Sequence, residues 1–346
     1  PEVTEEFERI LRFWLDRGVD GFRIDVGHGM AKPGELSDMD LAVLVPSDHG
    51  GPHSASLDDP RWDQEHVHDY HRGFRRVLDS YPGDRMAVGE MWVANDDRLA
   101  RYVRHDELSL AFNFELVLAQ WGAASFRRAI DSSLAAMAQV GAPCTWVLGN
   151  HDVDRPATRY GGGSRGLGRA RAAALVQLSL PGATYVYNGE ELGLANVDLP
   201  DEALRDPTWE RSGHRVRGRD GERVPLPWSG AAPPFGFSSS AKTWLPMPAY
   251  WAGRTARDQA DDTASTLALY RDALRVRREL LAAAPDFAWL DSPPDVLAYR
   301  RGPLAVLLNA SVSSVPTPDG EVLVASGPLD PDGAVPPDTA VWVRVP

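Results

Sequence analysis

The sequence predicts an α/β fold, with a parallel sheet covered by helices and a small antiparallel domain after it. Short apolar strands alternate with amphipathic helices up to about residue 282, which is typical of parallel strands joined by crossover helices. Beyond Pro285 only short alternating strands remain, separated by Pro, Gly and Asp turns. The length of 346 residues fits one large domain with a small satellite. About five strand–helix units suit either a doubly wound sheet or part of an eight-fold barrel.

The first helix is predicted over residues 4–18. Thr4 is the expected N-cap, and Gly18 is placed to end the helix. Apolar residues repeat at helical spacing and predict one buried face: Phe7, Ile10, Leu11, Trp14 and Leu15.

The remaining elements follow from the same periodicities. Strands are predicted at 19–26, 86–90, 111–114, 144–149 and 183–187. Helical faces are predicted around 67–78, 126–137, 167–178 and 264–282. Loops rich in Gly or Pro are expected up to Pro60 and over 195–262, and tail strands at 296–301, 304–309, 321–325 and 340–345.

Charge and composition narrow the classes of partner. The chain has 36 basic and 49 acidic residues, a net charge of −13, which argues against nucleic acid and anionic membrane as partners. No apolar run approaches the roughly 18 residues that a membrane span requires. The single cysteine, Cys144, excludes an internal disulfide and a thiolate zinc cluster. Together with the lack of a visible signal peptide it favours a cytoplasmic location.

Acidic residues follow three of the predicted strands. Asp25, Glu90 and Asp152 stand at strand ends, accompanied by Arg23 and His151. In a parallel barrel these ends share one face, where active sites lie. Glycoside hydrolysis uses such carboxylates, one ionised and one protonated. Taken singly, each acid also fits the N-cap of a following helix, and His151 a structural role.

Histidines and glycines suggest other sites that the spacing does not support. The histidines of 28–71 are scattered over a loop and a helix, so no metal site and no cofactor are assigned: His28, His49, His53, His66, His68 and His71. The glycines of 161–168 do not follow a strand as a dinucleotide fingerprint requires.

Taken together, the strand ends resemble the α-amylase superfamily, glycoside hydrolase family 13. Gly21-Phe22-Arg23-Ile24-Asp25-Val26 resembles its second signature, Val88-Gly89-Glu90 its third and Asn150-His151-Asp152 its fourth. The segments 187–193 and 219–228 resemble the α-glucosidase and oligo-1,6-glucosidase branch. The resemblance implies a (β/α)8 TIM-type barrel, with residues 1–284 as the C-terminal part of the catalytic barrel and 285–346 as an antiparallel β-sandwich-like domain.

The resemblance also implies roles for single residues. Asp25 would be the nucleophile that forms a covalent glucosyl-enzyme, kept ionised by Arg23, and Glu90 the general acid and base. His151 and Asp152 would hold sugar hydroxyls. Their implied outcome is retention, with the Asp25 and Glu90 carboxyls about 5–5.5 Å apart.

Two further positions carry implied roles in specificity. Arg219 would close the pocket around the non-reducing end of the sugar, which implies exo action. Val26, directly after the nucleophile, resembles members that tolerate α-1,6 linkages.

The resemblance implies that the chain begins just before the fourth barrel strand. The first signature, the domain inserted after the third strand and the acidic partner of Arg219 are then expected to be absent. Calcium remains an option only in the missing N-terminal part, and the truncated chain is expected to fold and turn over poorly.

The function implied is a retaining α-glucosidase acting on small oligosaccharides of the maltose or isomaltose type. One alternative is a transglycosylase or isomerase of the same family, which makes trehalose or isomaltulose by excluding water. Another is a catalytically inert fragment or binding relative. The oligomeric state is left open.

Overall fold

The computed structural model describes residues 2–35, 61–282, 284 and 286–345. Contacts divide these residues into two compact units. The first is built from residues 2–35, 61–116 and 129–146, and the second from 117–128 and 147–345. This division does not test the predicted border at 284/285, which stays a prediction. The predicted loop up to Pro60 falls mostly outside the described residues, as do His49 and His53.

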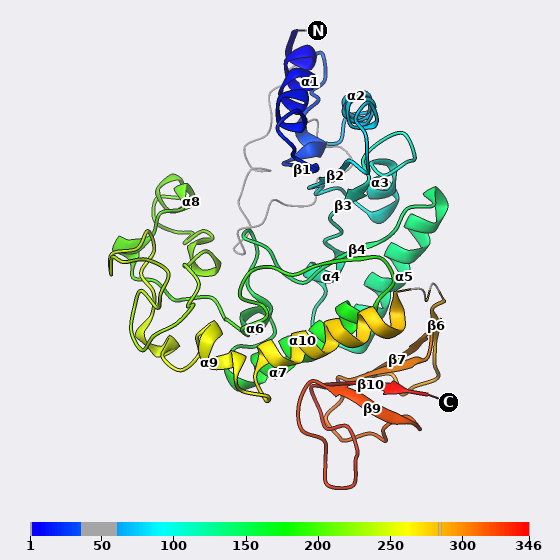
Figure 1. Ribbon diagram of the computed structural model, residues 1–346, viewed down its shortest axis with the longest axis vertical. Helices are drawn as coiled ribbons and strands as arrows, with labels where there is room; N and C mark the ends of the chain where they lie inside the picture. The colour runs from blue at the N-terminus through cyan, green and yellow to red at the C-terminus, as the bar shows by residue number, and fades with distance from the viewer. Residues whose placement is uncertain (1, 36–60, 283, 285, 346) are drawn as a thin grey trace. The chain divides into compact units, whose positions relative to one another are not determined.

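The first unit contains a parallel sheet of three strands in the order β1-β2-β3 (Figure 1). The strands are β1 (Gly21–Ile24), β2 (Met86–Gly89) and β3 (Leu110–Ala111). Arg23 lies opposite Val88 and Ile24 opposite Gly89, so the two strands end side by side. The helices of this unit are α1 (Glu2–Leu15), α2 (Val67–Asp79) and α3 (Asp96–Arg101), with a short 3₁₀ turn η1 (Gly27–Gly29). The predicted parallel arrangement is confirmed here.

The prediction for the first helix is partly wrong. The helix begins at Glu2, two residues before the expected Thr4 cap, and ends at Leu15, with Gly18 at a φ of +88° in the turn that follows. Leu11 and Leu15 are buried, but Phe7, Ile10 and Trp14 are 40–48% exposed. Periodicity identifies the apolar side of a helix, whereas its burial depends on what packs there. Within the described residues, the side that carries Ile10 and Trp14 is largely uncovered.

Several elements join the two units along the chain or lie in the second unit. The chain passes through α4 (Glu115–Leu118), α5 (Ala123–Val140) and β4 (Thr145–Val147). It continues through α6 (Pro156–Arg159), α7 (Gly163–Ser179) and β5 (Ala183–Tyr185). β4 and β5 form a two-stranded sheet. The helices α4 and α6, like α3 of the first unit, were not predicted, because four to six residues are too few to show a helical period.

The long segment 195–262 is more ordered than predicted. It contains η3 (Asp201–Ala203), α8 (Pro207–Arg211), η4 (Asp220–Glu222), η5 (Ala249–Trp251) and α9 (Ala256–Ala260). Local caps explain two of them. Asp206 caps α8 with proline at the first helical position, and Thr255 and Asp258 form a capping box at α9.

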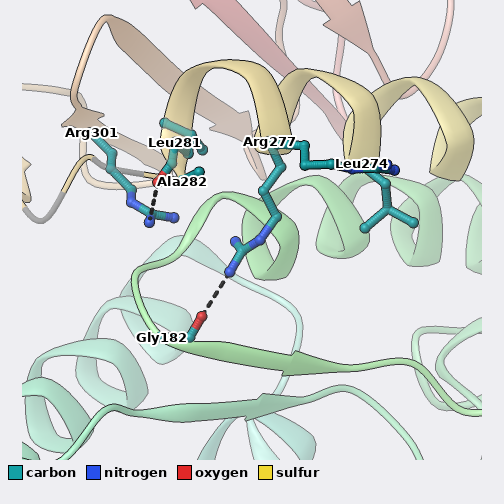
Figure 2. A pocket seen from close by; sticks show the side chains of 7 residues that line it. Gly182, Leu274, Arg277, Leu281, Ala282 and Arg301 are labelled. Carbon is teal, nitrogen blue, oxygen red and sulfur yellow. Dashed lines mark hydrogen bonds between the residues drawn. The ribbon is translucent and has the colours of Figure 1, made fainter.

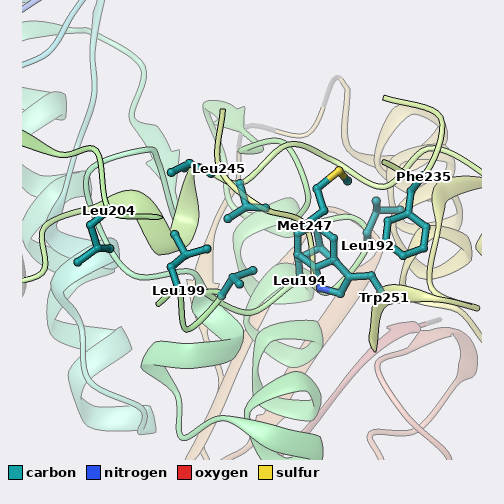
Figure 3. Packing of buried hydrophobic residues seen from close by; sticks show 10 residues of the cluster. Leu192, Leu194, Leu199, Leu204, Phe235, Leu245, Met247 and Trp251 are labelled. Carbon is teal, nitrogen blue, oxygen red and sulfur yellow. The ribbon is translucent and has the colours of Figure 1, made fainter. Parts of the chain in front are cut away.

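A hydrophobic cluster gives this segment its own core (Figure 3). Its buried members come from both ends of the segment and from the loop before it: Leu192, Leu194, Val197, Leu199, Leu204, Val224, Phe235, Leu245, Met247 and Trp251. The segment therefore presents fixed side chains rather than an open loop.

The C-terminal part is an antiparallel sheet of five strands in the order β6-β7-β8-β10-β9. Its strands are β6 (Ala288–Trp289), β7 (Val296–Arg301), β8 (Leu304–Asn309), β9 (Glu321–Ala325) and β10 (Thr339–Arg344). β7 to β10 confirm the four predicted tail strands. β10 packs against α7, where Trp342 Nε1 donates to the carbonyl oxygen of Leu175 over 3.0 Å.

Arg301 connects this sheet to the helices of the same unit, and Arg277 connects two of those helices to each other (Figure 2). The helix α10 (Thr266–Val276) continues into a π-helical turn, Arg277–Leu281. Arg277 donates to carbonyl oxygens of Leu178, Leu180 and Gly182 at the end of α7. Arg301 on β7 donates to the carbonyl oxygens of Ser179 and Leu180 at the end of α7 and of Leu281 in the π-helical turn. Both guanidiniums line a cavity of about 460 Å³, where they satisfy helix-terminal carbonyls.

None of the described helices is both long and apolar enough to span a bilayer.

Candidate active site

The first unit brings three predicted site residues into one network. Arg23 on β1 lies between two carboxyl groups. Its Nη1 is 2.5 Å from Oδ1 of Asp25, and its Nη2 is 2.8 Å from Oε2 of Glu90. Asp25 follows β1 and Glu90 follows β2, so the parallel register of these strands places both acids at the same edge.

Glu90 occupies the buried side of this network, with an exposed fraction of 3%. Its Oε1 accepts a hydrogen bond from Trp92 Nε1 over 3.1 Å, and its Oε2 accepts one from the backbone N–H of Val26 over 3.3 Å. Burial raises the pKa of Glu90, and a hydrogen bond with the Asp25 carboxyl raises it further, against the effects of Trp92, Arg23 and Val26. Glu90 is thus the group that tends to hold a proton, while the side chain of Asp25 is 68% exposed beside a guanidinium.

The backbone around Asp25 has an unusual conformation. Val26 has φ 45° and ψ 41°, in the left-handed region that β-branched residues avoid. This turn lets Gly27 N–H donate to the carbonyl oxygen of Glu90 over 3.1 Å. Strained residues of this kind cluster at functional sites. The strain at Val26 therefore supports a functional role for the turn after β1.

Trp92 is a site residue that the sequence did not single out. Besides its bond to Glu90, its indole stacks on Phe114 with ring centroids 3.9 Å apart. This stacking fixes the donor that faces Glu90. Its only signal in the sequence was its place two residues after Glu90.

The second unit brings the other three predicted site residues together. Asp152, 5% exposed, follows β4. Its Oδ1 accepts hydrogen bonds from Arg219 Nη1 at 2.6 Å and Arg223 Nη2 at 2.8 Å. Its Oδ2 lies 3.3 Å from His151 Nε2. The carboxylate of Asp152 therefore contacts two guanidiniums and an imidazole.

The prediction that Arg219 lacks an acidic partner is wrong, and two further residues belong to this network. Its acidic partner was expected to be absent, but Arg219 Nε donates to Asp206 over 2.8 Å in addition to its bond with Asp152. Although burial opposes it, hydrogen bonds from Arg219 and Thr208 hold the pKa of Asp206 well below its usual value. Asp206 precedes α8 and no sequence period connects it to Arg219. Arg223 was visible only as part of the segment that resembled the family.

The histidines of the first unit have packing partners. Nδ1 of His68 lies 2.8 Å from Glu107 Oε2, and Nε2 of His71 lies 3.1 Å from the carbonyl oxygen of Gly27. Burial lowers the pKa of His28 and of His71 to about 4, so both are neutral at pH 7. Among the described residues, no group of three or more His, Cys, Asp or Glu is arranged to hold a metal ion.

The six predicted site residues thus form two networks, one within each unit. Arg23, Asp25 and Glu90 make the first, and His151, Asp152 and Arg219 the second. Their catalytic roles, the convergence of the two networks and the separation of about 5–5.5 Å between carboxyls stay predictions. Chemically, the first network pairs an exposed carboxyl with a buried one that tends to hold a proton, and the second presents a carboxylate, two guanidiniums and an imidazole.

The chain matches a protein family and known relatives in sequence. Residues 1–284 match the family described as "Alpha amylase, catalytic domain". A probable alpha-glucosidase of Rhizobium meliloti (strain 1021) is 33% identical over 316 residues, which cover 87% of this chain and 56% of the relative. Oligo-1,6-glucosidase IMA5 of Saccharomyces cerevisiae is 28% identical over 336 residues, which cover 84% of this chain and 56% of the relative.

A solved structure matches the fold as well. The crystal structure of the α-glucosyl transfer enzyme XgtA superposes with a TM-score of 0.82 at 30% identity, covering 99% of this chain and 67% of that one. The chain therefore has the fold of that enzyme over nearly its whole length. It spans little more than half the length of the two curated relatives named above.

Proposed function

The chain belongs to the α-amylase family of glycoside hydrolases, and we propose that it acts as a retaining, exo-acting α-glucosidase. Its parallel strands are accordingly part of a (β/α)8 barrel, as predicted, and an antiparallel sheet follows. The proposed substrate is a small oligosaccharide with a terminal α-linked glucose, of the maltose or isomaltose type. The proposed location is the cytoplasm, supported by the single cysteine. We assign no cofactor, and we keep 284/285 as the proposed domain border.

The observation that carries this proposal is the Asp25–Arg23–Glu90 network. In a retaining glycosidase one carboxylate attacks the anomeric carbon while the other gives a proton to the leaving oxygen. Asp25, next to a guanidinium and exposed, suits the attack. Glu90 suits proton donation, because burial raises its pKa. After the leaving group departs, Glu90 would take a proton from water that hydrolyses the glucosyl ester on Asp25.

The second network supports the binding part of the proposal. Asp152, His151 and Arg219 offer charged acceptors and donors of the kind that bind sugar hydroxyls. We propose that this network holds the terminal glucose in the working enzyme. Arg219, anchored by Asp206, would then close the end of the pocket and restrict cleavage to terminal residues.

A second candidate function is glucosyl transfer. It is favoured by the 30% identity to XgtA, whose structure is described as that of an α-glucosyl transfer enzyme. Transfer would use the same covalent intermediate and replace water with a sugar hydroxyl. The products distinguish the two reactions. Glucose release from maltose or isomaltose supports hydrolysis, whereas a new disaccharide supports transfer or isomerisation.

The decisive experiment traps the proposed intermediate. The chain is incubated with 5-fluoro-α-glucosyl fluoride, whose glucosyl ester is hydrolysed slowly, and its peptides are analysed by mass spectrometry. We expect the added mass on the peptide that carries Asp25, and none in the Asp25→Asn variant. Asp25→Asn should also abolish any glucose release. Labelling of another residue, or turnover that survives in Asp25→Asn, would refute the proposed mechanism.

A further inference from the structure

Asn196 joins two loops of the second unit through one side-chain amide. Its Nδ2 donates to Oδ1 of Asp154 over 2.6 Å and to Oε2 of Glu222 over 3.1 Å. Its Oδ1 accepts the backbone N–H of Arg155 over 2.8 Å. Asp154 and Arg155 lie in the segment after β4 that carries Asp152, and Glu222 is the last residue of η4. The amide therefore links the segment after β4 to η4.

The backbone around Asn196 makes the same connection. Val197 N–H donates to the carbonyl oxygen of Gly221 over 2.9 Å. A methyl group on Gly221 would lie 3.0 Å from the carbonyl oxygen of Val197 and 3.3 Å from Cβ of Asn196, so the two backbone segments approach closely here. Arg155 Nη2 also donates to the carbonyl oxygen of Glu222 over 2.7 Å. η4 is thus held at its middle and at its end.

The two ends of η4 carry the arginines of the second network. Arg219 directly precedes η4 and Arg223 directly follows it. Both donate to Oδ1 of Asp152, and Arg223 Nε also donates to the carbonyl oxygen of His151 over 2.7 Å. A shift of η4 away from Asn196 would move both guanidiniums off Asp152. The position of Asn196 therefore bears on the shape of the proposed sugar site.

The amide also brings two carboxyl groups together, which makes the link sensitive to pH. Glu222 is 3% exposed, and burial raises its pKa to about 8, with a further increase from the charge of Asp154. A hydrogen bond from its own backbone N–H opposes this increase, as do the charges of Arg223 and Arg155. Tyr187 also lies beside it, since its hydroxyl donates to the carbonyl oxygen of Glu222 over 3.1 Å. At neutral pH Glu222 is mostly protonated, so the pair on Asn196 carries a single charge.

We propose that Asn196 is a positioning residue, whose hydrogen bonds fix η4 where Arg219 and Arg223 both donate to Asp152. Ionisation of Glu222 weakens the attachment of η4 to Asn196 as the pH rises. A carboxyl that holds its proton more tightly in the closed loop than in an open one favours the closed loop at low pH. This stabilisation is complete below about 4.5, declines as the pH rises, and is gone above about 8. The effect on sugar binding rests on the proposed function, whereas the effect on the loop does not.

Hydrogen exchange measured by mass spectrometry between pH 5.5 and 9 tests the loop directly. After correction for intrinsic exchange, we expect protection of peptides over 219–224 to fall at least tenfold between pH 6 and pH 8, then to level off. Glu222→Gln keeps an oxygen acceptor but cannot ionise, so its protection should stay constant over this range. Asn196→Ala should lower protection of 219–224 already at pH 6 and leave α7 peptides unchanged.

Glu190→Gln is the matched control. Glu190 is a second buried carboxyl of this unit whose pKa burial raises to about 8, and no described hydrogen bond joins it to Asn196. This variant should keep the pH dependence of 219–224. The proposal is overturned if wild-type protection there does not change with pH, if Glu222→Gln behaves like the wild type, or if Glu190→Gln also removes the effect. The Glu222→Gln measurement stands even if Asn196→Ala fails to fold.

The readout separates this inference from the proposed function, because exchange requires no turnover. If the exchange pattern holds but the chain neither binds nor cleaves α-glucosides, the proposed function fails and the loop mechanism stands. If the chain is active, the KM of Glu222→Gln should rise less between pH 6 and pH 8 than that of the wild type.

Discussion

Nη2 of Arg23 lies 2.8 Å from Oε2 of Glu90, although 67 residues separate the two in the chain. Two parallel strands in register make this contact, since Arg23 pairs with Val88 and Glu90 follows one residue after β2. The same guanidinium also holds Asp25. One arginine therefore sets the distance between the two acids and the electrostatic balance between them.

Removing this arginine should change how Glu90 titrates. The guanidinium lowers the pKa of Glu90, whereas burial and the Asp25 carboxyl raise it. In Arg23→Ala we expect the pKa of Glu90 to move further up, as measured by ¹³C NMR of the labelled carboxyl. Arg23→Lys should give a smaller shift, because an ammonium keeps the charge but cannot bridge both acids. An unchanged titration of Glu90 in Arg23→Ala would contradict this account.

The same variant has an expected kinetic effect if the proposed function holds. Arg23→Ala should lower kcat/KM at least 100-fold, because both acids lose their orientation. The alkaline limb of its pH profile should move upward, since the protonated acid survives to higher pH.

The success of the sequence predictions depended on how local their signal was. Asp25 and Glu90 could be found because each follows a short apolar strand, and parallel strands bring such positions together. Asp206 could not be found in this way, because its contact with Arg219 joins two irregular segments that show no helical or strand periodicity. The left-handed turn at Val26 was also invisible, since valine rarely adopts it. For α1 the pattern identified the apolar side correctly but could not show that Phe7, Ile10 and Trp14 on it stay exposed.

The turn at Val26 should be a source of measurable strain. A left-handed backbone costs an L-residue roughly 1–2 kcal/mol, and asparagine tolerates it better than valine. Val26 is 39% exposed, so little apolar burial is lost on substitution. We expect Val26→Asn to raise the free energy of unfolding by about 1 kcal/mol in urea titrations. The matched variant Val26→Thr keeps a β-branched side chain and should stay within about 0.5 kcal/mol of the wild type. Equal stability of both variants would show that the turn is not strained.

Val26 also allows a test of specificity under the proposed function. One side chain of this size changes a substrate preference by about 1–3 kcal/mol at most. The ratio of kcat/KM for isomaltose to that for maltose should therefore fall in Val26→Ala by about 10-fold, and by no more than about 200-fold, if Val26 favours α-1,6 linkages. An unchanged ratio would remove Val26 from the specificity determinants.

The exposed side of α1 should make the chain prone to self-association. Val3, Phe7, Ile10 and Trp14 form an apolar stripe with exposed fractions of 40–70%. We expect the double variant Ile10→Glu with Trp14→Glu to shift sedimentation velocity profiles towards the monomer. Its stability should change by less than about 1 kcal/mol, because both side chains are already largely exposed. By contrast, Leu11→Ala on the buried side should cost about 2–4 kcal/mol. If the double variant associates like the wild type, another surface is responsible.

Glu190 should limit the stability of the second unit at alkaline pH. Burial raises the pKa of its carboxyl to about 8, although Arg155 and Arg159 lower it. The side chain packs so closely against Gly149 that a methyl group there would lie 2.8 Å from Oε1. A raised pKa means that the folded state binds the proton more tightly than the unfolded chain. The resulting stabilisation is full below about pH 4.5 and is lost as the pH rises through about 8.

Replacing this carboxyl with an amide of the same shape should remove that loss. Unfolding free energies of Glu190→Gln, measured in urea from pH 5 to 9, should decline less with pH than those of the wild type, by up to about 4 kcal/mol over the range. Part of the slope should persist, because Glu222 titrates in the same window. The exposed Glu202 provides the control, since Glu202→Gln should leave the slope within about 0.5 kcal/mol of the wild type. Parallel curves for Glu190→Gln and the wild type would mean that the carboxyl is already ionised at neutral pH and is held by Arg155 and Arg159.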